Sequence, residues 1–268
     1  MTSPSKWTDL RQRMISGFAL ALVGIVAVRL GGVWFTALAT IAAGLMLWEL
    51  AVMLGAGRKA LIAFALGAGA MLAARVTSGP LEIGMLLLVA AAAATVVQRD
   101  RAICFTYGLA ILLAADGLTD FREVNGGTWL FWLIFVVITT DIAGYFAGRL
   151  IGGRKFWPRI SPKKTWSGTI AGWIGAAAIG MLFRTFTSAG VDLIWISAAV
   201  SLASQMGDIT ESAIKRRAGI KDSSNLIPGH GGLLDRFDGL LGASLAMLAF
   251  ALFVKVPVVS IVLPIVGH

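Results

Sequence analysis

The sequence predicts an all-α, polytopic integral membrane protein built as a helix bundle. Of its 268 residues, 57% are hydrophobic and only 14% are charged, whereas soluble domains carry about 25% charged residues. The mean hydropathy of +0.83 agrees with this class. Apolar runs near the ~20 residues that cross a bilayer recur along the whole chain. We therefore expect residues 1–268 to form a single membrane-embedded domain.

About nine apolar runs can be read as transmembrane helices, separated by glycine-rich or proline-containing breaks. The first run lacks a small-residue cleavage site and is followed at once by another span, so it is not read as a signal peptide. The expected spans are residues 14–30, 33–54, 60–75, 81–97, 102–115, 129–148, 168–185, 191–207 and 240–256. Residues 1–128 are expected to be a transmembrane scaffold. Residues 129–268 are expected to be a catalytic half with polar loops at 149–167 and 208–238.

The basic residues orient this arrangement. Most of the 23 Lys and Arg residues fall in one set of loops, and the exceptions are Arg29, Arg75, Arg122, Arg184 and Lys255. Loops rich in Lys and Arg face the cytoplasm, so both polar loops are expected on the cytoplasmic face of the cytoplasmic (inner) membrane. The net charge of +9 then faces membrane lipids with anionic head groups. Nucleic acid is not an expected partner, because no nucleic-acid motif accompanies these short loops.

The loop at 149–167 contains the cluster Ser161-Pro162-Lys163-Lys164-Thr165. Cations in such a loop are also expected as simple membrane anchors. Here, however, proline fixes a turn beside two ammonium groups flanked by hydroxyls. This combination can hold a polyphosphate or a lipid phosphate.

The segment 208–238 gathers charge between apolar runs. It holds five of the 14 acidic residues, namely Asp208, Glu211, Asp222, Asp235 and Asp238. The first two share one helix face with Ser212 and Lys215, at i, i+3, i+4 and i+7, and the last two are three residues apart. Ion pairs among loop charges explain part of this pattern. The whole of it is better explained by a metal and phosphate site that faces water.

Glycines lie between the two acidic groups, in Pro228-Gly229-His230-Gly231-Gly232. Glycine lets backbone N–H groups approach an anion closely. A lone His230 is more often a structural residue than a catalyst. Since no other histidine lies nearby and Cys104 is the one cysteine, the oxygen-rich set of side chains favours Mg²⁺ or a similar hard cation.

Asp141 lies inside the expected span 129–148, where a carboxylate costs about 2.5–3.5 kcal/mol on insertion scales. One explanation is a pairing with Arg149 or with the Thr139 and Thr140 hydroxyls. We favour a functional role, because Asp141 lies toward the end of the span where the other charges gather. Glu49 and Glu82 are read as interfacial or packing residues.

At these residues the chain resembles a known family. Ser212 to Arg216, Lys221-Asp222 and Leu226 to Asp238 resemble the signature of phosphatidate cytidylyltransferase, also called CDP-diacylglycerol synthase. The Ser161–Thr165 cluster and the segment Asp141–Arg149 are similar to the same family. Two departures stand out: Ser167 follows Trp166 where the family usually has Glu, and Gly239 follows Asp238 where Ser is common.

The resemblance implies that CTP and phosphatidate react, with Mg²⁺ and room for a second cation, to give CDP-diacylglycerol and pyrophosphate. It implies a metal held by Asp208 and Asp235, with Asp238 and Asp141 as further or neighbouring ligands. Residues expected to act catalytically are Lys215, Arg216, Lys221, Asp222, His230 and Arg236. Residues expected to bind substrate are Ser161, Lys163, Lys164, Thr165, Ser212, Gly229, Gly231 and Gly232. The resemblance is also compatible with a homodimer.

Three alternatives stay open at this stage. A CTP-dependent lipid kinase would transfer the γ-phosphate, and a related cytidylyltransferase would use another phospholipid. A transporter would line a route with Asp141 and the basic loops, but transporters commonly show repeated halves, and no repeat is visible.

Ser167 is expected to act partly as the N-cap of the span that begins near 168.

Overall fold

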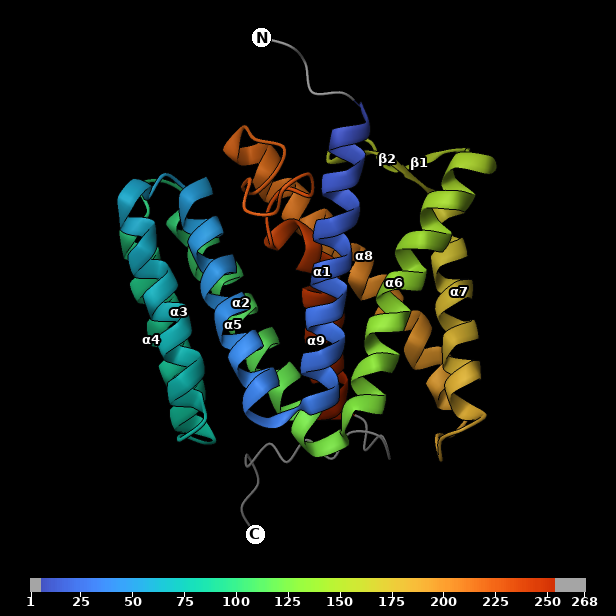
Figure 1. The fold of residues 1–268 in the computed structure, drawn as a ribbon, viewed down its shortest axis with the longest axis horizontal. Helices are drawn as coiled ribbons and strands as arrows, with labels where there is room; N and C mark the ends of the chain where they lie inside the picture. The colour runs from blue at the N-terminus through green and yellow to red at the C-terminus, as the bar shows by residue number, and fades with distance from the viewer. Residues whose placement is uncertain (1–5, 254–268) are drawn as a thin grey trace. The chain divides into compact units, whose positions relative to one another are not determined.

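The computed structural model describes residues 6–253, and its described part confirms an all-α polytopic membrane protein. A short two-stranded sheet is the exception to the helical pattern (Figure 1). The helices are α1 (Lys6–Leu30), α2 (Gly32–Met53), α3 (Ala60–Ala74), α4 (Pro80–Val96), α5 (Arg101–Asn125), α6 (Gly127–Leu150), α7 (Trp166–Arg184), α8 (Asp192–Ala218) and α9 (Leu234–Phe253). The strands are β1 (Lys155–Trp157) and β2 (Ser161–Thr165).

Each expected span overlaps one of these helices. In the described chain, six segments are long and apolar enough to cross a membrane: Arg11–Leu30, Gly32–Met53, Gly57–Ala74, Arg101–Asn125, Gly127–Leu150 and Trp166–Arg184. Helix α4 is equally apolar but has 17 residues. The end of the expected span 240–256 lies outside the described residues.

Four helices extend six or more residues beyond the expected spans. Helix α1 begins at Lys6 rather than 14, and α9 begins at Leu234 rather than 240. Helix α5 continues to Asn125 rather than ending at 115, and α8 continues to Ala218 rather than ending at 207. In both helices the apolar run stops at charged residues, but neither Gly nor Pro interrupts the backbone hydrogen bonds strongly enough to end the helix. Asp208 to Lys215 therefore lie on regular helix.

The chain divides into two compact units. The first unit contains the chain up to Asp116 together with Ala218–Phe237, and the second contains Gly117–Arg217 and the described chain from Asp238 onward. The predicted single domain, divided near residue 128, stays a prediction.

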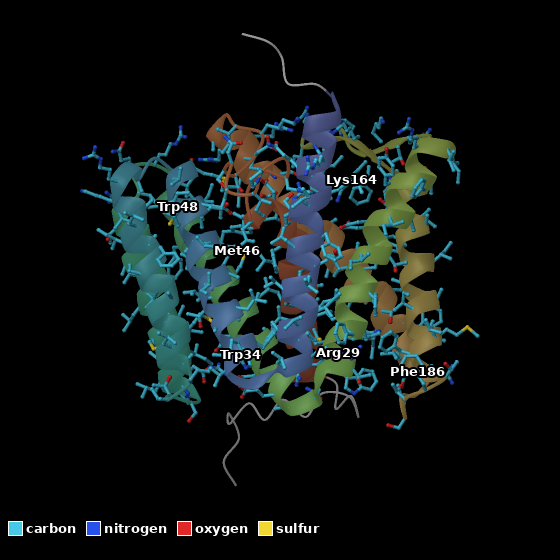
Figure 2. The ribbon with its side chains drawn as sticks, viewed as in Figure 1. Arg29, Trp34, Met46, Trp48, Lys164 and Phe186 are labelled. Carbon is cyan, nitrogen blue, oxygen red and sulfur yellow. The ribbon has the colours of Figure 1, made fainter. Side chains whose placement is uncertain are left out.

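Within the first unit, α2 packs against α3 through small residues. A Cβ at Gly67 would lie 3.2 Å from the Cα of Gly44, so the two helices approach closely at glycine. Leu47, Leu50 and Met71 are fully buried in this part of the core. Trp34 and Trp48 lie near opposite ends of α2 (Figure 2), which is where aromatic side chains anchor a helix in the membrane interfaces.

Within the second unit, glycine again sets the helix spacing. A Cβ at Gly168 of α7 would lie 2.5 Å from the carbonyl oxygen of Gly144 in α6. A Cβ at Gly207 of α8 would lie 2.3 Å from the carbonyl oxygen of Asp238 in α9. Any larger residue would separate these helices, so glycine brings the backbones that carry Asp208 and Asp238 together.

The strands β1 and β2 form an antiparallel hairpin between α6 and α7, with Lys155 opposite Thr165 and Trp157 opposite Ser161. The rings of Phe156 and Trp166 meet edge to face with centroids 4.7 Å apart. Lys164 lies at the hairpin end of α7, whereas Phe186 lies beyond its other end (Figure 2). The hairpin thus holds the Ser161–Thr165 cluster in an extended conformation at one end of the second unit.

The N-cap of α7 is Thr165, and the expectation that Ser167 fills this position is wrong. The Thr165 hydroxyl accepts a hydrogen bond of 3.2 Å from the Gly168 N–H. Strand β2 ends at Thr165 with extended backbone, the conformation an N-cap requires. Ser167 is already inside the helix, and its hydroxyl donates to the Gly152 carbonyl.

Candidate active site

A cavity of about 390 Å³ opens in the second unit, at the hairpin end of α6 and α7. Its lining brings together several residues that the sequence singled out: Asp141, Arg149, Lys163, Lys164, Thr165 and Asp208. They come from α6, from β2 and from α8, which are distant in the chain. Cavities of about 300–1,000 Å³ with a few convergent polar groups are typical ligand sites.

Asp208 has polar contacts through both carboxylate oxygens. Its Oδ2 forms an ion pair with the Lys164 ammonium, and its Oδ1 accepts a hydrogen bond of 3.2 Å from the Ser212 hydroxyl. The side chains of Lys164 and Asp208 are 24% and 29% exposed. Both can therefore be reached from the cavity while part of their surface is shielded from water.

Asp238 lies in the first turns of α9, two residues before the expected span 240–256. Burial, followed by the nearby charge of Asp208 and, least of the three, that of Asp141, raises the pKa of its carboxyl to about 7. The Gly239 N–H and the Lys215 ammonium act in the opposite direction. The charges of Asp208 and Asp141 therefore act on Asp238, while Lys215 partly offsets them.

Lys215 is held by another carboxylate. Its ammonium pairs with Glu211 one turn earlier on α8, and the Glu211 side chain is fully buried. The helix face predicted from Asp208, Glu211, Ser212 and Lys215 is therefore an interacting row of side chains.

Two further groups shape the cavity wall. The Arg149 guanidinium donates a hydrogen bond of 2.7 Å to the Tyr145 hydroxyl. Gln205, which the sequence did not single out, accepts from the Trp173 indole at 3.1 Å and donates to the Thr169 carbonyl at 3.2 Å. Its amide lies in an apolar helix run, and its partner on α7 is 32 residues away, so no local pattern marks it.

In the first unit, the segment between α8 and α9 wraps around Asp235. One oxygen, Oδ2, accepts hydrogen bonds from the Ser223 N–H at 2.9 Å, the Ser223 hydroxyl at 3.0 Å and the Gly232 N–H at 2.8 Å. These contacts organise the segment around the head of α9. Metal ligation by Asp235 stays a prediction.

His230 also has structural contacts. Its Nδ1 lies 2.8 Å from the Ser16 hydroxyl of α1, and its carbonyl accepts from the Arg236 Nε at 3.0 Å. Gly229 and Gly231 have φ of +75° and +83°, a conformation that favours glycine. The N–H of His230 donates to the Ile227 carbonyl. Phosphate binding by Gly229, Gly231 and Gly232 stays a prediction.

Glu49, read from the sequence as an interfacial or packing residue, makes hydrogen bonds that the sequence analysis did not predict. Its carboxylate is buried with no exposed surface. Oε1 accepts from the Ser224 hydroxyl at 2.6 Å and the Leu233 N–H at 2.8 Å, and Oε2 accepts from the Leu234 N–H at 2.6 Å. The feature of the sequence that could have indicated this role is the presence of a glutamate within the otherwise apolar helix α2.

The remaining predicted residues lie on the surface of their elements. Arg216 is exposed in the last turn of α8, and Lys221 and Asp222 are exposed in the segment that follows. Their predicted roles stay predictions.

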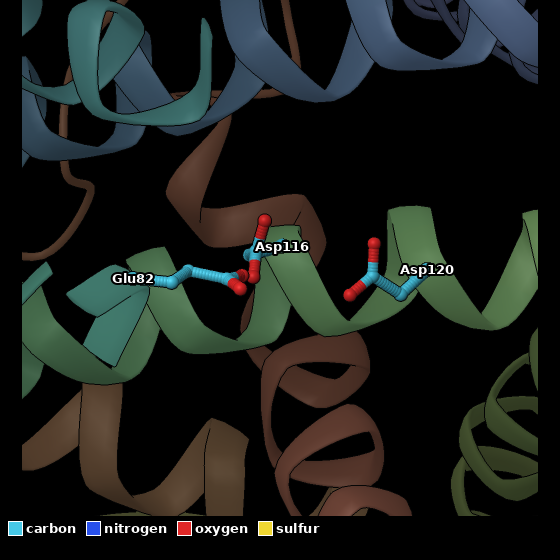
Figure 3. Close-up of side chains that lie close together, drawn as sticks. All are labelled: Glu82, Asp116 and Asp120. Carbon is cyan, nitrogen blue, oxygen red and sulfur yellow. The ribbon is translucent and has the colours of Figure 1, made fainter. Parts of the chain in front are cut away.

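One acidic cluster in the described chain could hold a metal ion: the carboxylate oxygens of Glu82, Asp116 and Asp120 lie within 4.8 Å of one another (Figure 3). None of these is a predicted ligand. Asp116 and Asp120 are one turn apart on α5, and Asp116 is already paired with the Arg75 guanidinium. The cluster therefore has a cation of its own.

Comparison with known proteins places this geometry in context. A family model described as the cytidylyltransferase family matches residues 11–255. The chain is 36% identical over 266 residues to a phosphatidate cytidylyltransferase of Brucella suis, covering 94% of this chain and 97% of that protein. Over shorter regions it is 41% identical to the Bacillus subtilis enzyme of the same name, covering 43% of this chain and 44% of that one. It is 42% identical to the enzyme of that name from Haemophilus influenzae, covering 44% and 43%.

Proposed function

Because this chain belongs to the cytidylyltransferase family, we propose that it transfers the cytidylyl group of CTP to phosphatidate, giving CDP-diacylglycerol and pyrophosphate. The relatives that match it bear the name of this activity. The reaction belongs to phospholipid biosynthesis. The comparisons offer no support for a lipid kinase or a transporter.

The observation that carries the proposal is the cavity in the second unit, where cations and carboxylates share one lining. Phosphoryl-type transfer needs positioning and charge neutralisation more than covalent chemistry. Lys163, Lys164 and Arg149 supply positive charge for phosphates. Asp141 and Asp208 supply oxygens for a metal ion.

The metal ion that we propose here is Mg²⁺, because carboxylate oxygens are the ligands that this cation prefers. Burial, followed by the charges of Asp208 and Asp141, raises the pKa of Asp238 to about 7, and a hard divalent cation would relieve the repulsion among these carboxylates. We assign these three as the residues that would hold it, and their number leaves room for a second cation. When bound, Mg²⁺ would neutralise charge on the triphosphate.

The chemistry requires no strong general base from the chain. A phosphate monoester has a second pKa near ~6 and is largely dianionic at neutral pH. One phosphatidate oxygen forms a bond to the α-phosphorus of CTP, and the bond from that phosphorus to the α,β-bridging oxygen breaks. Pyrophosphate leaves with the electron pair of the broken bond.

The chain's own residues then bind and orient the reactants. Lys163 and Lys164 lie on β2 at the cavity, so we assign them with Ser161 to phosphate binding. Lys164 now pairs with Asp208; a cation at Asp208 would leave its ammonium available for phosphate. Lys215, Arg216, Lys221 and Arg236 are assigned to the triphosphate and departing pyrophosphate, and Asp222 and His230 to the order of their segment.

We propose the bacterial inner membrane as the location, with the cavity on its cytoplasmic face. The relatives are bacterial, and the Lys- and Arg-rich loops predict this orientation. The arrangement lets water-soluble CTP and a membrane lipid meet at one interface. A homodimer stays a prediction.

The test uses purified protein in detergent with phosphatidate, Mg²⁺ and CTP labelled on either the α- or the γ-phosphate. We expect the α-label in the lipid product and the γ-label in released pyrophosphate. Transfer of the γ-label to lipid would instead show a kinase, and no transfer of either label would contradict the proposal. Replacing phosphatidate by diacylglycerol is the matched substrate control, since it lacks the attacking phosphate.

A further inference from the structure

We propose that Glu49 is a positioning residue, which holds the segment 223–234 and the head of α9 in their working conformation through backbone N–H groups. The residue lies on α2, in the part of the chain that the sequence assigns to scaffold. Its partners are 175 to 185 residues away in the chain. The activity part of the proposal rests on the proposed function, and the structural part does not.

The first argument is the geometry of the hydrogen bonds. The N–H groups of Leu233 and Leu234 belong to the start of α9, where the first four N–H groups of a helix have no partner within the helix. Glu49 accepts from both, at 2.8 and 2.6 Å, one with each oxygen. It therefore caps α9 from another helix, and a carboxylate at this end also complements the helix dipole.

The second argument is burial. The Glu49 side chain has no exposed surface, and Leu234 is likewise fully buried. A buried carboxylate is costly unless hydrogen bonds satisfy it. Hydrogen bonds that involve a charged group are also about twice as strong as neutral ones. The contacts consequently fix the segment far more firmly than exposed pairs would.

The third argument is the fit around Gly232. A Cβ at this residue would lie 2.5 Å from the Glu49 Oε1 and 1.9 Å from the Ser223 hydroxyl. Only glycine leaves room for both the Glu49 carboxylate and the Ser223 hydroxyl at this point of the segment. The segment is thus held by hydrogen bonds to two carboxylates, Glu49 and Asp235.

The functional consequence follows along α9. The helix that begins at Leu234 carries Asp238 one turn later, and Asp238 belongs to the proposed metal-binding group. Because a helix is stiff over one turn, fixing the start of α9 also fixes the position of Asp238 along the helix and the side of the helix on which its carboxylate lies. Residues that orient metal ligands typically change metal affinity or activity by about 10–100-fold when replaced.

The test replaces Glu49 by Gln, which keeps the shape but offers one acceptor oxygen in place of two. Hydrogen–deuterium exchange should show the Leu233 and Leu234 amides exchanging about 10–100-fold faster, because a strong hydrogen bond is lost. The Mg²⁺ concentration for half-maximal rate should rise about 10–100-fold, with the phosphatidate KM unchanged. Glu49→Asp, which keeps both acceptors on a shorter stem, should restore part of both effects.

Thr40→Val is the matched control. Thr40 is also buried on α2, and its hydroxyl has no hydrogen-bond partner in the described part of the chain. We expect wild-type exchange at residues 233 and 234 and an unchanged Mg²⁺ requirement in this variant. Unchanged amide exchange in Glu49→Gln, or the same changes in Thr40→Val, would overturn the proposal.

If Glu49→Gln does not fold, Ser224→Ala decides. It removes one donor to Glu49 and leaves the backbone donors in place. Faster exchange at Leu233 then supports the proposal, and unchanged exchange contradicts it. Amide exchange is measured without substrate. An inactive wild-type protein would therefore refute the proposed function, while the exchange result would still test the structural role of Glu49.

Discussion

Carboxylates have two different kinds of partner in this molecule. At the cavity of the second unit, Asp208 contacts a lysine ammonium and Asp238 lies in the field of two other acids. In the first unit, Glu49 and Asp235 accept hydrogen bonds mostly from backbone N–H groups. An ammonium on a flexible stem can be exchanged for a metal ion, whereas a backbone N–H cannot leave without local unfolding. The first group is suited to binding and the second to fixing the backbone.

The strongest way to test this contrast is Asp208→Asn. The variant removes a charge from the proposed metal group and leaves Lys164 without its ion-pair partner. We expect turnover per folded molecule to fall at least about a hundredfold, since a direct ligand should exceed the effect of its supporting residues. The measurement is initial rate at saturating CTP, with folding checked by size-exclusion chromatography.

Asp192→Asn is the matched control for that experiment. Asp192 is exposed at the other end of the same helix, α8, and should keep normal turnover. Asp235→Asn sharpens the contrast, because Asp235 has both a predicted role as a metal ligand and observed hydrogen bonds to the segment before α9. A loss of activity in this variant has to be assigned to one of the two. Near-normal activity of Asp208→Asn at limiting Mg²⁺ would remove it from the proposed ligands, and the same criterion applies to Asp235→Asn.

The second largest effect is expected for Gly232→Ala, which disturbs the carboxylates that hold backbone N–H groups, Glu49 and Asp235. The new Cβ would overlap the Ser223 hydroxyl and crowd Glu49. Overpacking of this kind costs about 1–3 kcal/mol, so we expect a lower Tm in detergent together with a loss of turnover. Gly69→Ala in α3 is the control, because no other atom lies within 4 Å of its Cβ position; an equal loss of Tm in both variants would show that crowding is not the cause.

The sequence predicted the fold better than it predicted these contacts. Hydropathy alone locates the helices, because crossing a membrane requires a long apolar run. It also located the pocket residues Asp141, Lys164 and Asp208, since charge beside apolar segments is conspicuous. The role of Glu49 depends on N–H groups more than 170 residues away, and no local pattern encodes such a partner. The hairpin was missed because its strands are short and lack an alternating apolar pattern.

A third prediction uses pH to test whether Asp238 belongs to the metal-binding carboxylates of the cavity. The pKa of Asp238 is raised from 3.8 to about 7 by burial and neighbouring acids. Metal ions bind the deprotonated carboxylate, so Mg²⁺ affinity should rise as the pH increases through about 7 and then level off. Isothermal titration at several pH values measures this, and Asp238→Asn should flatten the profile in that range.

The same shift affects stability with the opposite sign. Without metal, the folded state holds the Asp238 proton more tightly than the unfolded chain does. Its contribution to the free energy of unfolding is therefore complete below about pH 3.8 and is lost as the pH rises toward 7. Thermal unfolding of the wild type relative to Asp238→Asn isolates the effect. A Mg²⁺ affinity that is flat with pH in the wild type would contradict the assignment of Asp238 to the metal group.

The smallest expected effect concerns the two hydroxyls at the start of α7. Thr165 is the N-cap, with its hydroxyl accepting from the Gly168 N–H, and the methyl-for-hydroxyl change Thr165→Val removes that acceptor at nearly constant shape. We expect the free energy of unfolding to fall by about 0.5–2 kcal/mol, as for other lost N-caps. Ser167→Ala should cost less, because Ser167 only donates to a carbonyl at the neighbouring turn and shares a hydrogen bond with Thr165. Thr165→Ser keeps the acceptor and should retain most of the stability. Thermal unfolding in detergent ranks the three variants, and a larger loss for Ser167→Ala than for Thr165→Val would show that α7 depends on Ser167 instead.

Turnover per folded molecule adds a second comparison, because Thr165 also lines the cavity. A normal rate in Thr165→Val would confine its role to the helix cap, whereas a reduced rate would support its predicted contact with substrate.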